Sequence, residues 1–250
     1  NFGSSGGGTL DTNVASSNNF VVRGTTFTTQ GGTGNTIQGS FNMDAGDVTF
    51  NVADGTDASD LTVSAVLGNA AGIVKQGAGT MELTGVNTYS GATTISAGTL
   101  EIGGSGQLDR GSYAQAIANN GTFNYNSSAD QTLSGLISGS GAVVKDNSGN
   151  LTITASNTYS GGTTINGGTV ILASGASEDA LGSGAVTMNS GGSLQLWISA
   201  GGNHNIDNDF TMDGGTVYSK DGQYNLTGTM TLNVGGGTLG GTWSDKHIQV

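Results

Sequence analysis

Two thirty-residue stretches, 73–102 and 143–172, decide how this sequence folds. The first reads IVKQGAGTMELTGVNTYSGATTISAGTLEI and the second reads VVKDNSGNLTITASNTYSGGTTINGGTVIL. The repeat has a period of 70 without a gap, and both copies contain the run Asn-Thr-Tyr-Ser-Gly, at 87–91 and 157–161. Self-similarity at a fixed period is the sequence signature of a repeat architecture. We therefore expect a chain that is built by stacking similar units.

Short runs that alternate apolar and polar residues surround these repeats. In each run the apolar residues fall on one face of the expected strand. These sets are Val48, Phe50 and Val52; Leu151 and Ile153; Leu194 and Leu196; and Met230, Leu232 and Val234. Alternation buries one side of a strand and leaves the other side in water. Such short strands gain stability by stacking on copies of themselves. The sequence therefore predicts an all-β fold, a single right-handed parallel β-helix (β-solenoid) of about ten coils, continuous over residues 1–250.

The repeat period sets the size of each coil. If one period holds three coils, each coil has about 23 residues, and the stack is a rod about 50 Å long. The 47 Gly residues suit the corners of the coils, where Gly allows positive φ or a close backbone approach. Pro, which would remove a ladder donor, is absent. We expect a corner at 87–91 with Tyr89 outside or over the coil edge, and the next strand to begin at 93–95.

Composition excludes several functional classes. The formal net charge is −12, so no nucleic-acid partner is expected. No Cys is present, which removes disulfides and thiolate chemistry. No apolar run approaches the ~18 residues of a membrane-spanning helix, so no membrane span is expected. The sequence begins at Asn1 without a basic segment before an apolar one, so we expect a piece of a longer product.

The repeated residues resemble a known family. Residues 77–100 resemble the autotransporter-associated β-strand repeat, and residues 147–170 resemble a second copy. Residues 133–145 and 181–196 resemble the lead-in and the follow-on of that repeat. The resemblance implies a right-handed β-helical passenger region at the cell surface of a Gram-negative bacterium. It also implies a structural repeat, which brings no catalytic residues with it.

Few residues offer chemistry. His204 lies near Asp207 and Asp209, but a metal site needs more ligands at hairpin or helix spacing, so a surface loop is favoured. His247 is the second of the two His residues, and no Gly-x-Ser-x-Gly elbow motif supports a Ser-His-Asp triad. The acidic run Asp54, Asp57 and Asp60 lacks the pattern of known Ca²⁺ loops, so a solvated turn is favoured.

Other residues have a structural and a functional interpretation. Lys75 and Lys145 occupy equivalent repeat positions, where an exposed strand-end Lys discourages edge pairing. Trp197 and Trp243 are candidate sugar-stacking platforms, although packing near the C-terminal side is favoured. Arg23 and Arg110 are the only Arg residues, too few for the basic groove of an enzyme that cleaves acidic sugars. A Thr-rich run at 25–29 suggests ice binding, but no Thr-x-Thr once per coil is found.

The sequence thus predicts no catalytic, cofactor-binding or metal-binding residue, and no enzyme. The favoured function is a non-enzymatic extracellular rod of the passenger or adhesin type, at the bacterial cell surface. One alternative is a filament subunit that self-associates head to tail, because neither end of the sequence resembles a polar cap. A second alternative is a β-helix that binds or cleaves glycans, with a cell-surface or glycan partner.

Overall fold

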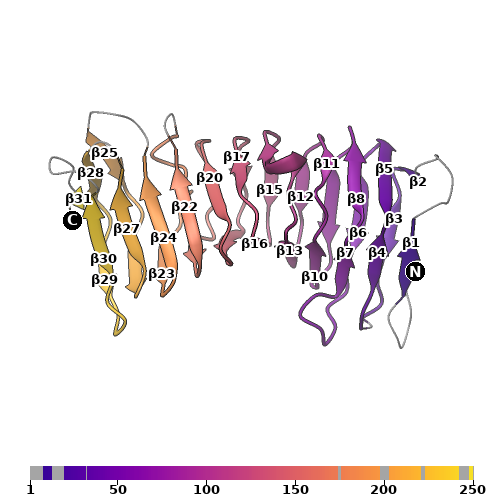
Figure 1. Ribbon diagram of the computed structural model, residues 1–250, viewed down its shortest axis with the longest axis horizontal. Helices are drawn as coiled ribbons and strands as arrows, with labels where there is room; N and C mark the ends of the chain where they lie inside the picture. The colour runs from indigo at the N-terminus through magenta and orange to yellow at the C-terminus, as the bar shows by residue number, and fades with distance from the viewer. Residues whose placement is uncertain are drawn as a thin grey trace.

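The structure, a computed structural model, describes residues 8–12, 20–31, 33–173, 176–197, 203–220, 223–241 and 248–249. Figure 1 shows an elongated stack of strands that cross the long axis, with the two ends of the chain at opposite ends of the stack. All pairs of named strands are parallel, as in a chain that winds round an axis. The structure confirms the all-β solenoid of about ten turns.

Each turn contributes a strand to up to three sheets, called faces 1, 2 and 3. Face 1 is an eleven-stranded sheet of β1 (Thr9–Asp11), β4 (Thr36–Gln38), β7 (Leu61–Val63), β10 (Thr80–Leu83), β13 (Thr99–Gly104), β16 (Thr122–Ser127), β19 (Ala142–Lys145), β21 (Thr163–Ile165), β23 (Val186–Asn189), β26 (Phe210–Asp213) and β29 (Met230–Leu232).

Face 2 begins with a four-stranded sheet and continues as a seven-stranded one. Its strands are β2 (Phe20–Arg23), β5 (Ser40–Ala45), β8 (Val66–Asn69), β11 (Thr88–Tyr89), β14 (Ser112–Tyr113), β17 (Gln131–Leu133), β20 (Asn150–Ile153), β22 (Gly168–Leu172), β24 (Gly192–Leu196), β27 (Thr216–Ser219) and β30 (Thr238–Gly241). The 3₁₀ turn η1 (Asp109–Gly111) precedes β14.

Face 3 is a six-stranded sheet followed by a three-stranded one. Its strands are β3 (Thr26–Thr28), β6 (Val48–Asn51), β9 (Ile73–Gln76), β12 (Thr93–Ile95), β15 (Ile117–Asn119), β18 (Ile137–Ser138), β25 (Asn203–Ile206), β28 (Gln223–Leu226) and β31 (Ile248–Gln249). The expected strand at 93–95 is therefore confirmed as β12.

The core is a continuous column of inward side chains. On face 1 the paired inward residues are, in order, Leu10, Ile37, Val63, Leu83, Ile102, Tyr125, Lys145, Ile165, Met188, Met212 and Leu232. Burying one apolar side chain contributes about 1.5–3 kcal/mol, so each rung stabilises its neighbours. The predicted burial of Val48, Phe50 and Val52 is confirmed.

The last predicted run does not follow this rule. Leu232 is 62% exposed and Val234 is fully exposed, whereas the same alternation inside the stack buries both positions of a run. The physical reason for Leu232 is its position, because β29 is the last strand of face 1 in the described part of the chain, whereas Val234 lies in the turn that follows β29. An inward side chain on that strand has a rung on one side only.

The repeat period does not equal three coils, and this expectation is wrong. Ile73 pairs with Thr93, Thr93 with Ile117, and Ile117 with Ile137, so three turns on face 3 lead from position 73 to position 137. The counterpart of Ile73 in the second copy is Val143, which lies beyond that position, in β19 of face 1. The second repeat copy is therefore displaced by three turns and one face, and its motif lies on a different side of the solenoid.

Candidate functional site

The repeat motif begins with a buried Asn that connects three coils. The side chain of Asn87 is fully buried between faces 1 and 2. Its Oδ1 accepts the Leu67 backbone N–H at 3.0 Å, and its Nδ2 donates to the carbonyl oxygens of Gly85 and Gln107 at 3.0 and 3.2 Å. One amide thus satisfies the backbone of the coils below and above it, which a buried corner requires.

Asn157 performs the same function in the second copy. Its Oδ1 accepts the Ile137 N–H at 2.7 Å, and its Nδ2 donates to the Ala180 carbonyl at 2.7 Å. The corner predicted at each motif is therefore present in both copies. In each copy a buried Asn side-chain amide stabilises the corner through hydrogen bonds to the backbone.

The Tyr of the motif points inward, so the prediction that it lies outside is wrong. Tyr89 is fully buried, and its hydroxyl lies 2.8 Å from Thr93 Oγ1. The Thr93 hydroxyl lies 2.8 Å from the Tyr113 hydroxyl of the next turn, which donates to the Gly91 carbonyl at 2.6 Å. A buried phenol needs a hydrogen-bond partner, and the Thr four residues later supplies it. Burial raises the pKa of Tyr113 to about 12.

The second copy repeats the contact without the third hydroxyl. Tyr159 OH lies 2.6 Å from Thr163 Oγ1, and Thr163 donates to the Leu181 carbonyl at 3.2 Å. Burial raises the pKa of Tyr159 well above its ordinary value. The motif Asn-x-Tyr-x-x-x-Thr is therefore a unit of internal hydrogen bonds, and none of these groups is presented to solvent for catalysis.

Lys75 is buried, and the interpretation as an exposed strand-end residue is wrong. Its ammonium donates to the carbonyl oxygens of Gln76, Gly77 and Ala97 at 3.0, 2.9 and 3.1 Å. Ala97 belongs to the next coil, so the ammonium joins two turns at one corner. Burial lowers the pKa of Lys75 to about 8, opposed by the nearby carboxylate of Asp60.

Lys145 forms the same arrangement one face further round. Its ammonium donates to the carbonyls of Asp146, Asn147 and Gly167, the last two at 2.7 and 3.2 Å. Burial lowers its pKa to about 8, with Asp146 and Asp130 acting in the opposite direction. The ammonium lies 5.7 Å from the centre of the Tyr125 ring. Both repeat lysines therefore stabilise corners from within.

Gly91 and Gly161 end the motif because successive coils approach each other closely there. A Cβ at Gly91 would lie 2.2 Å from the Gly72 nitrogen, and a Cβ at Gly161 would lie 2.5 Å from the Gly141 carbonyl carbon. These distances are far shorter than a van der Waals contact, so only Gly fits.

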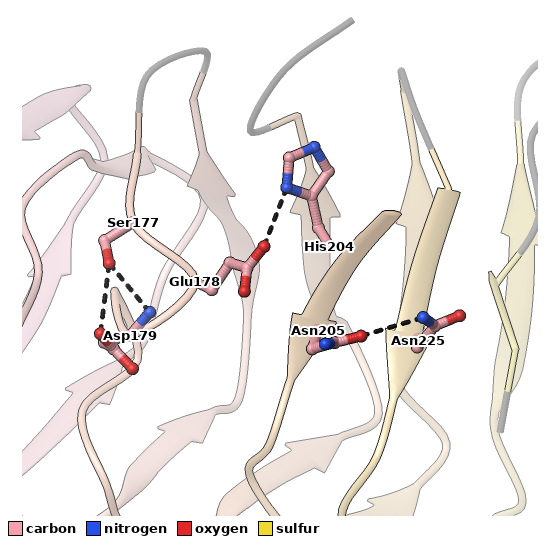
Figure 2. A network of polar contacts seen from close by, with 6 residues as sticks. All are labelled: Ser177, Glu178, Asp179, His204, Asn205 and Asn225. Carbon is pink, nitrogen blue, oxygen red and sulfur yellow. Dashed lines mark hydrogen bonds and ion pairs between the residues drawn. The ribbon is translucent and has the colours of Figure 1, made fainter. Parts of the chain in front are cut away.

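Polar side chains gather on the outside near the C-terminal half, as Figure 2 shows. His204 lies on strand β25, which corrects the expectation of a surface loop, and its Nδ1 is 3.1 Å from Glu178 Oε1. Its ring lies 5.3 Å from that of Tyr224. Nearby, Asn225 donates to Asn205 at 2.9 Å. The His–Glu contact joins consecutive coils, like the other side-chain ladders.

A small hollow of about 210 Å³ lies beside this cluster. Its lining includes Glu178, Asp179, Asp207 and Asn208. Asn208 donates to two backbone carbonyls, those of Gly182 and Gly184, so it is already partnered. In the part of the chain that the structure describes, no three His, Asp or Glu side chains form a group that could hold a metal ion.

The acidic run near residue 57 is divided between surface and core. Asp54 and Asp57 are exposed, as predicted for a solvated turn. Asp60 is buried, which corrects that prediction for one member. It accepts the backbone N–H groups of Gly55 at 2.7 Å and Thr80 at 2.8 Å. Asp60 therefore closes a turn and does not present a ligand.

The aromatic and basic candidates have internal partners. The ammonium of Lys220 lies 3.8 Å from the ring centre of Trp197 and covers one face of the ring. Arg23 forms an ion pair with Asp44 at 2.6 Å, and the Arg110 guanidinium lies 3.8 Å from the Asp109 carboxylate. Trp243 and His247 lie outside the described residues.

A column of Thr residues on face 1 is not apparent in the sequence. The outward residues that pair in register are Thr9, Thr36, Thr62, Glu82, Glu101, Asn124, Val144, Thr164, Thr187, Thr211 and Thr231. Thr36 donates to the hydroxyl of Thr9 at 3.0 Å. Two residues along the strand, Asn189 donates to Asn166 at 2.6 Å, and Asn166 donates to Asp146 at 2.7 Å. Face 1 is thus covered by polar ladders.

Comparison with known proteins agrees with this geometry. The model of the passenger-associated transport repeat matches residues 73–102 and 143–172, the two copies described above. The chain is 33% identical over 260 aligned residues to a protein named adhesin BmaC autotransporter, from Brucella suis biovar 1. That match covers 86% of this chain and 7% of the relative. No solved structure matches the chain. The chain therefore contains two passenger-associated transport repeats, which are built into a parallel β-helix.

Proposed function

We propose that this chain is a non-enzymatic, extracellular shaft segment of an adhesin-type surface protein. The observation that carries the proposal is the use of the repeated residues. Asn87, Tyr89, Thr93 and Lys75, four buried polar residues of the first copy, all bond inward or to a neighbouring coil. Because these polar groups stabilise the corners of the solenoid itself, the repeat is suited to a structural role, in which it adds length and rigidity to the shaft.

The location and the continuity of the shaft belong to the same proposal. The similarity to a protein named as an autotransporter adhesin supports a place at the cell surface. We expect the solenoid to be continuous through residues 1–250, because faces 1 and 2 both extend from the first to the last described turns. No helix in the described residues is long and apolar enough to cross a membrane.

Surface display tests the proposal. The chain is exported in bacteria between a surface anchor and a distal tag, and intact cells are treated with protease. We expect an accessible tag and a shaft that resists digestion. Leu151→Asp, which places a charge in the apolar column, should abolish that resistance, whereas Asp207→Asn on the surface should not.

The opposite pattern would contradict a shaft. If Asp207→Asn or Glu178→Gln abolished a hydrolytic activity or a binding activity while protease resistance stayed unchanged, the outer cluster would be the functional site. No specific observation favours the glycan alternative, since Lys220 already occupies one face of Trp197.

A further inference from the structure

Part of face 1 presents a regular array of polar side chains to solvent. Its members belong to the turns of β21, β23, β26 and β29, which follow one another along the C-terminal half of the stack in Figure 1. In each of these turns an outward Thr is followed two residues later by Asn or Asp. The pairs, called the Thr-Asx array, are Thr164 and Asn166, Thr187 and Asn189, Thr211 and Asp213, and Thr231 and Asn233.

Strand pairing arranges the array in straight columns. Thr164 pairs with Thr187, Thr187 with Thr211, and Thr211 with Thr231. Neighbouring rungs of a sheet are about 4.8 Å apart, and two residues along a parallel strand span about 6.6 Å. The Thr-Asx array is therefore a grid with two fixed spacings, one along the axis and one across it.

The side chains of this grid have little conformational freedom. Thr is branched at Cβ, which restricts its χ1 angle. In the second column, Asn189 donates to Asn166 at 2.6 Å, and Asn166 donates to Asp146 at 2.7 Å, so these amides are fixed along the axis. A surface whose groups are already ordered loses less entropy when it binds a ligand.

The Thr hydroxyl groups are available to a ligand. Thr164, Thr187 and Thr211 are partly exposed, and Thr231 is exposed. Within the described residues, none of these four hydroxyls forms a hydrogen bond with another group of the protein. Each Thr therefore contributes a stiff side chain with a methyl group and an unpaired hydroxyl group.

The array carries little charge, in contrast to the chain as a whole. The formal net charge of the chain is −12, but Asp213 is the one ionisable residue among the four pairs. Nearer the N-terminus, Glu82 and Glu101 occupy the Thr column of face 1 and place charges on it. An uncharged ligand therefore fits the Thr-Asx array better than a polycation or a polyanion does.

We propose that the Thr-Asx array binds the surface of ice. Ice is an uncharged lattice of hydrogen-bonding groups, and its water oxygens repeat at spacings similar to the two spacings of the array. A single hydrogen bond to ice replaces one to liquid water and gives little net free energy. A grid of ordered groups, in contrast, matches the lattice and does not match the disordered liquid.

Two observations bear on the choice of this ligand. The sequence hides a Thr that recurs once per coil, because the turns differ in length, whereas the strand pairing shows it directly. The outward residues of β21, β23, β26 and β29 include no aromatic ring, so a sugar has no platform for stacking on these strands. The features of the array thus favour an ice lattice over a glycan.

Partitioning into growing ice tests the proposal with the fluorescently labelled 250-residue chain. Ice is grown slowly from a dilute solution, and the protein in the ice is compared with the protein left in the liquid. We expect the wild type to be incorporated into the ice, whereas a protein that does not bind ice is excluded. The double variant Thr187→Lys, Thr211→Lys places two charges in the middle of the grid and should lose this incorporation.

A matched double variant controls for surface charge and folding. Thr94→Lys, Thr152→Lys changes two outward Thr residues on faces 3 and 2 and should partition like the wild type. Urea denaturation followed by circular dichroism confirms that both double variants remain folded. Inhibition of ice recrystallisation provides a second measurement and should show the same order of variants.

The results that overturn the proposal are distinct. Wild-type chain that is excluded from ice overturns it, as does a Thr187→Lys, Thr211→Lys variant that partitions like the wild type. Co-sedimentation with microcrystalline cellulose and chitin tests the glycan. Binding there that the double variant loses, without incorporation into ice, would assign the array to a glycan and overturn ice binding. None of these results affects the shaft function, which protease resistance on the cell tests separately.

Discussion

Replacing the two buried lysines by Met should make the stability of this protein insensitive to pH between 7 and 9.5. Lys75 and Lys145 have pKa values near 8 in the folded chain, against an ordinary value of 10.5. As pH rises from 8 to 10.5, the folded state loses these protons before the unfolded state does. The unfolded state then binds more protons, so the free energy of unfolding of the wild type rises with pH.

The magnitude follows from the two pKa values. One pKa unit corresponds to about 1.4 kcal/mol, so a lysine displaced from 10.5 to about 8 contributes a gain of roughly 2 kcal/mol between pH 7 and 9.5. Two lysines give about 4 kcal/mol. Above pH 10 the trend reverses, because Tyr113 and Tyr125 have pKa values of about 12 and the unfolded chain loses their protons first.

Urea denaturation followed by circular dichroism at several pH values between 7 and 9.5 measures the effect. The wild type should gain stability across this range, and the double variant Lys75→Met, Lys145→Met should not. At pH 7 each single variant should be less stable by about 1–3 kcal/mol, because three corner carbonyls lose their donor. Lys220→Met is the control and should retain the wild-type slope. A slope that survives in the double variant would refute the inference that these ammonium groups are desolvated at the corners.

Three further changes test the repeat motif, each by urea denaturation. Asn157→Ala should cost about 2–4 kcal/mol, because the Ile137 N–H and the Ala180 carbonyl are left buried without partners; no loss would mean that this corner is hydrated. Tyr159→Phe removes one hydroxyl contact and should cost only about 0.5–1.5 kcal/mol, less than Asn157→Ala. Gly161→Ala should cost about 1–3 kcal/mol, since a Cβ there meets the preceding coil at Gly141, and an unchanged midpoint would contradict that close approach.

The fold could be predicted from the sequence because its signals are local. The alternation at 48–52 fixes which side chains face inward, and two copies at fixed offset indicate stacking. Stacking on equivalent neighbours then follows without any knowledge of long-range pairing.

The interior of the corners could not be predicted as well. Residue type alone predicts an exposed Lys75, since Lys is rarely buried. Yet Lys75 shares the inward phase of Ile73, and this alternation is the signal that could have placed it inside. The turn composition around Tyr89 favours the surface of a corner, although Thr93, four residues later, supplies a partner for its hydroxyl.

The Thr column escapes detection for a different reason. Thr164, Thr187, Thr211 and Thr231 are unequally spaced along the chain, so a search with one fixed period does not align them. The turns differ in length because loops between strands vary while the rungs stay in register. Only the pairing of strands shows which residues are neighbours.

The displacement of the second repeat by three turns and one face has a consequence for longer arrays. Further copies at the same spacing would return to the same side of the axis only at every third copy, after ten turns. A glycan, antibody or protease that recognises the outer surface of the motif would then find successive copies on successive faces of the solenoid. A long array of such repeats would therefore present the motif on all three of its faces.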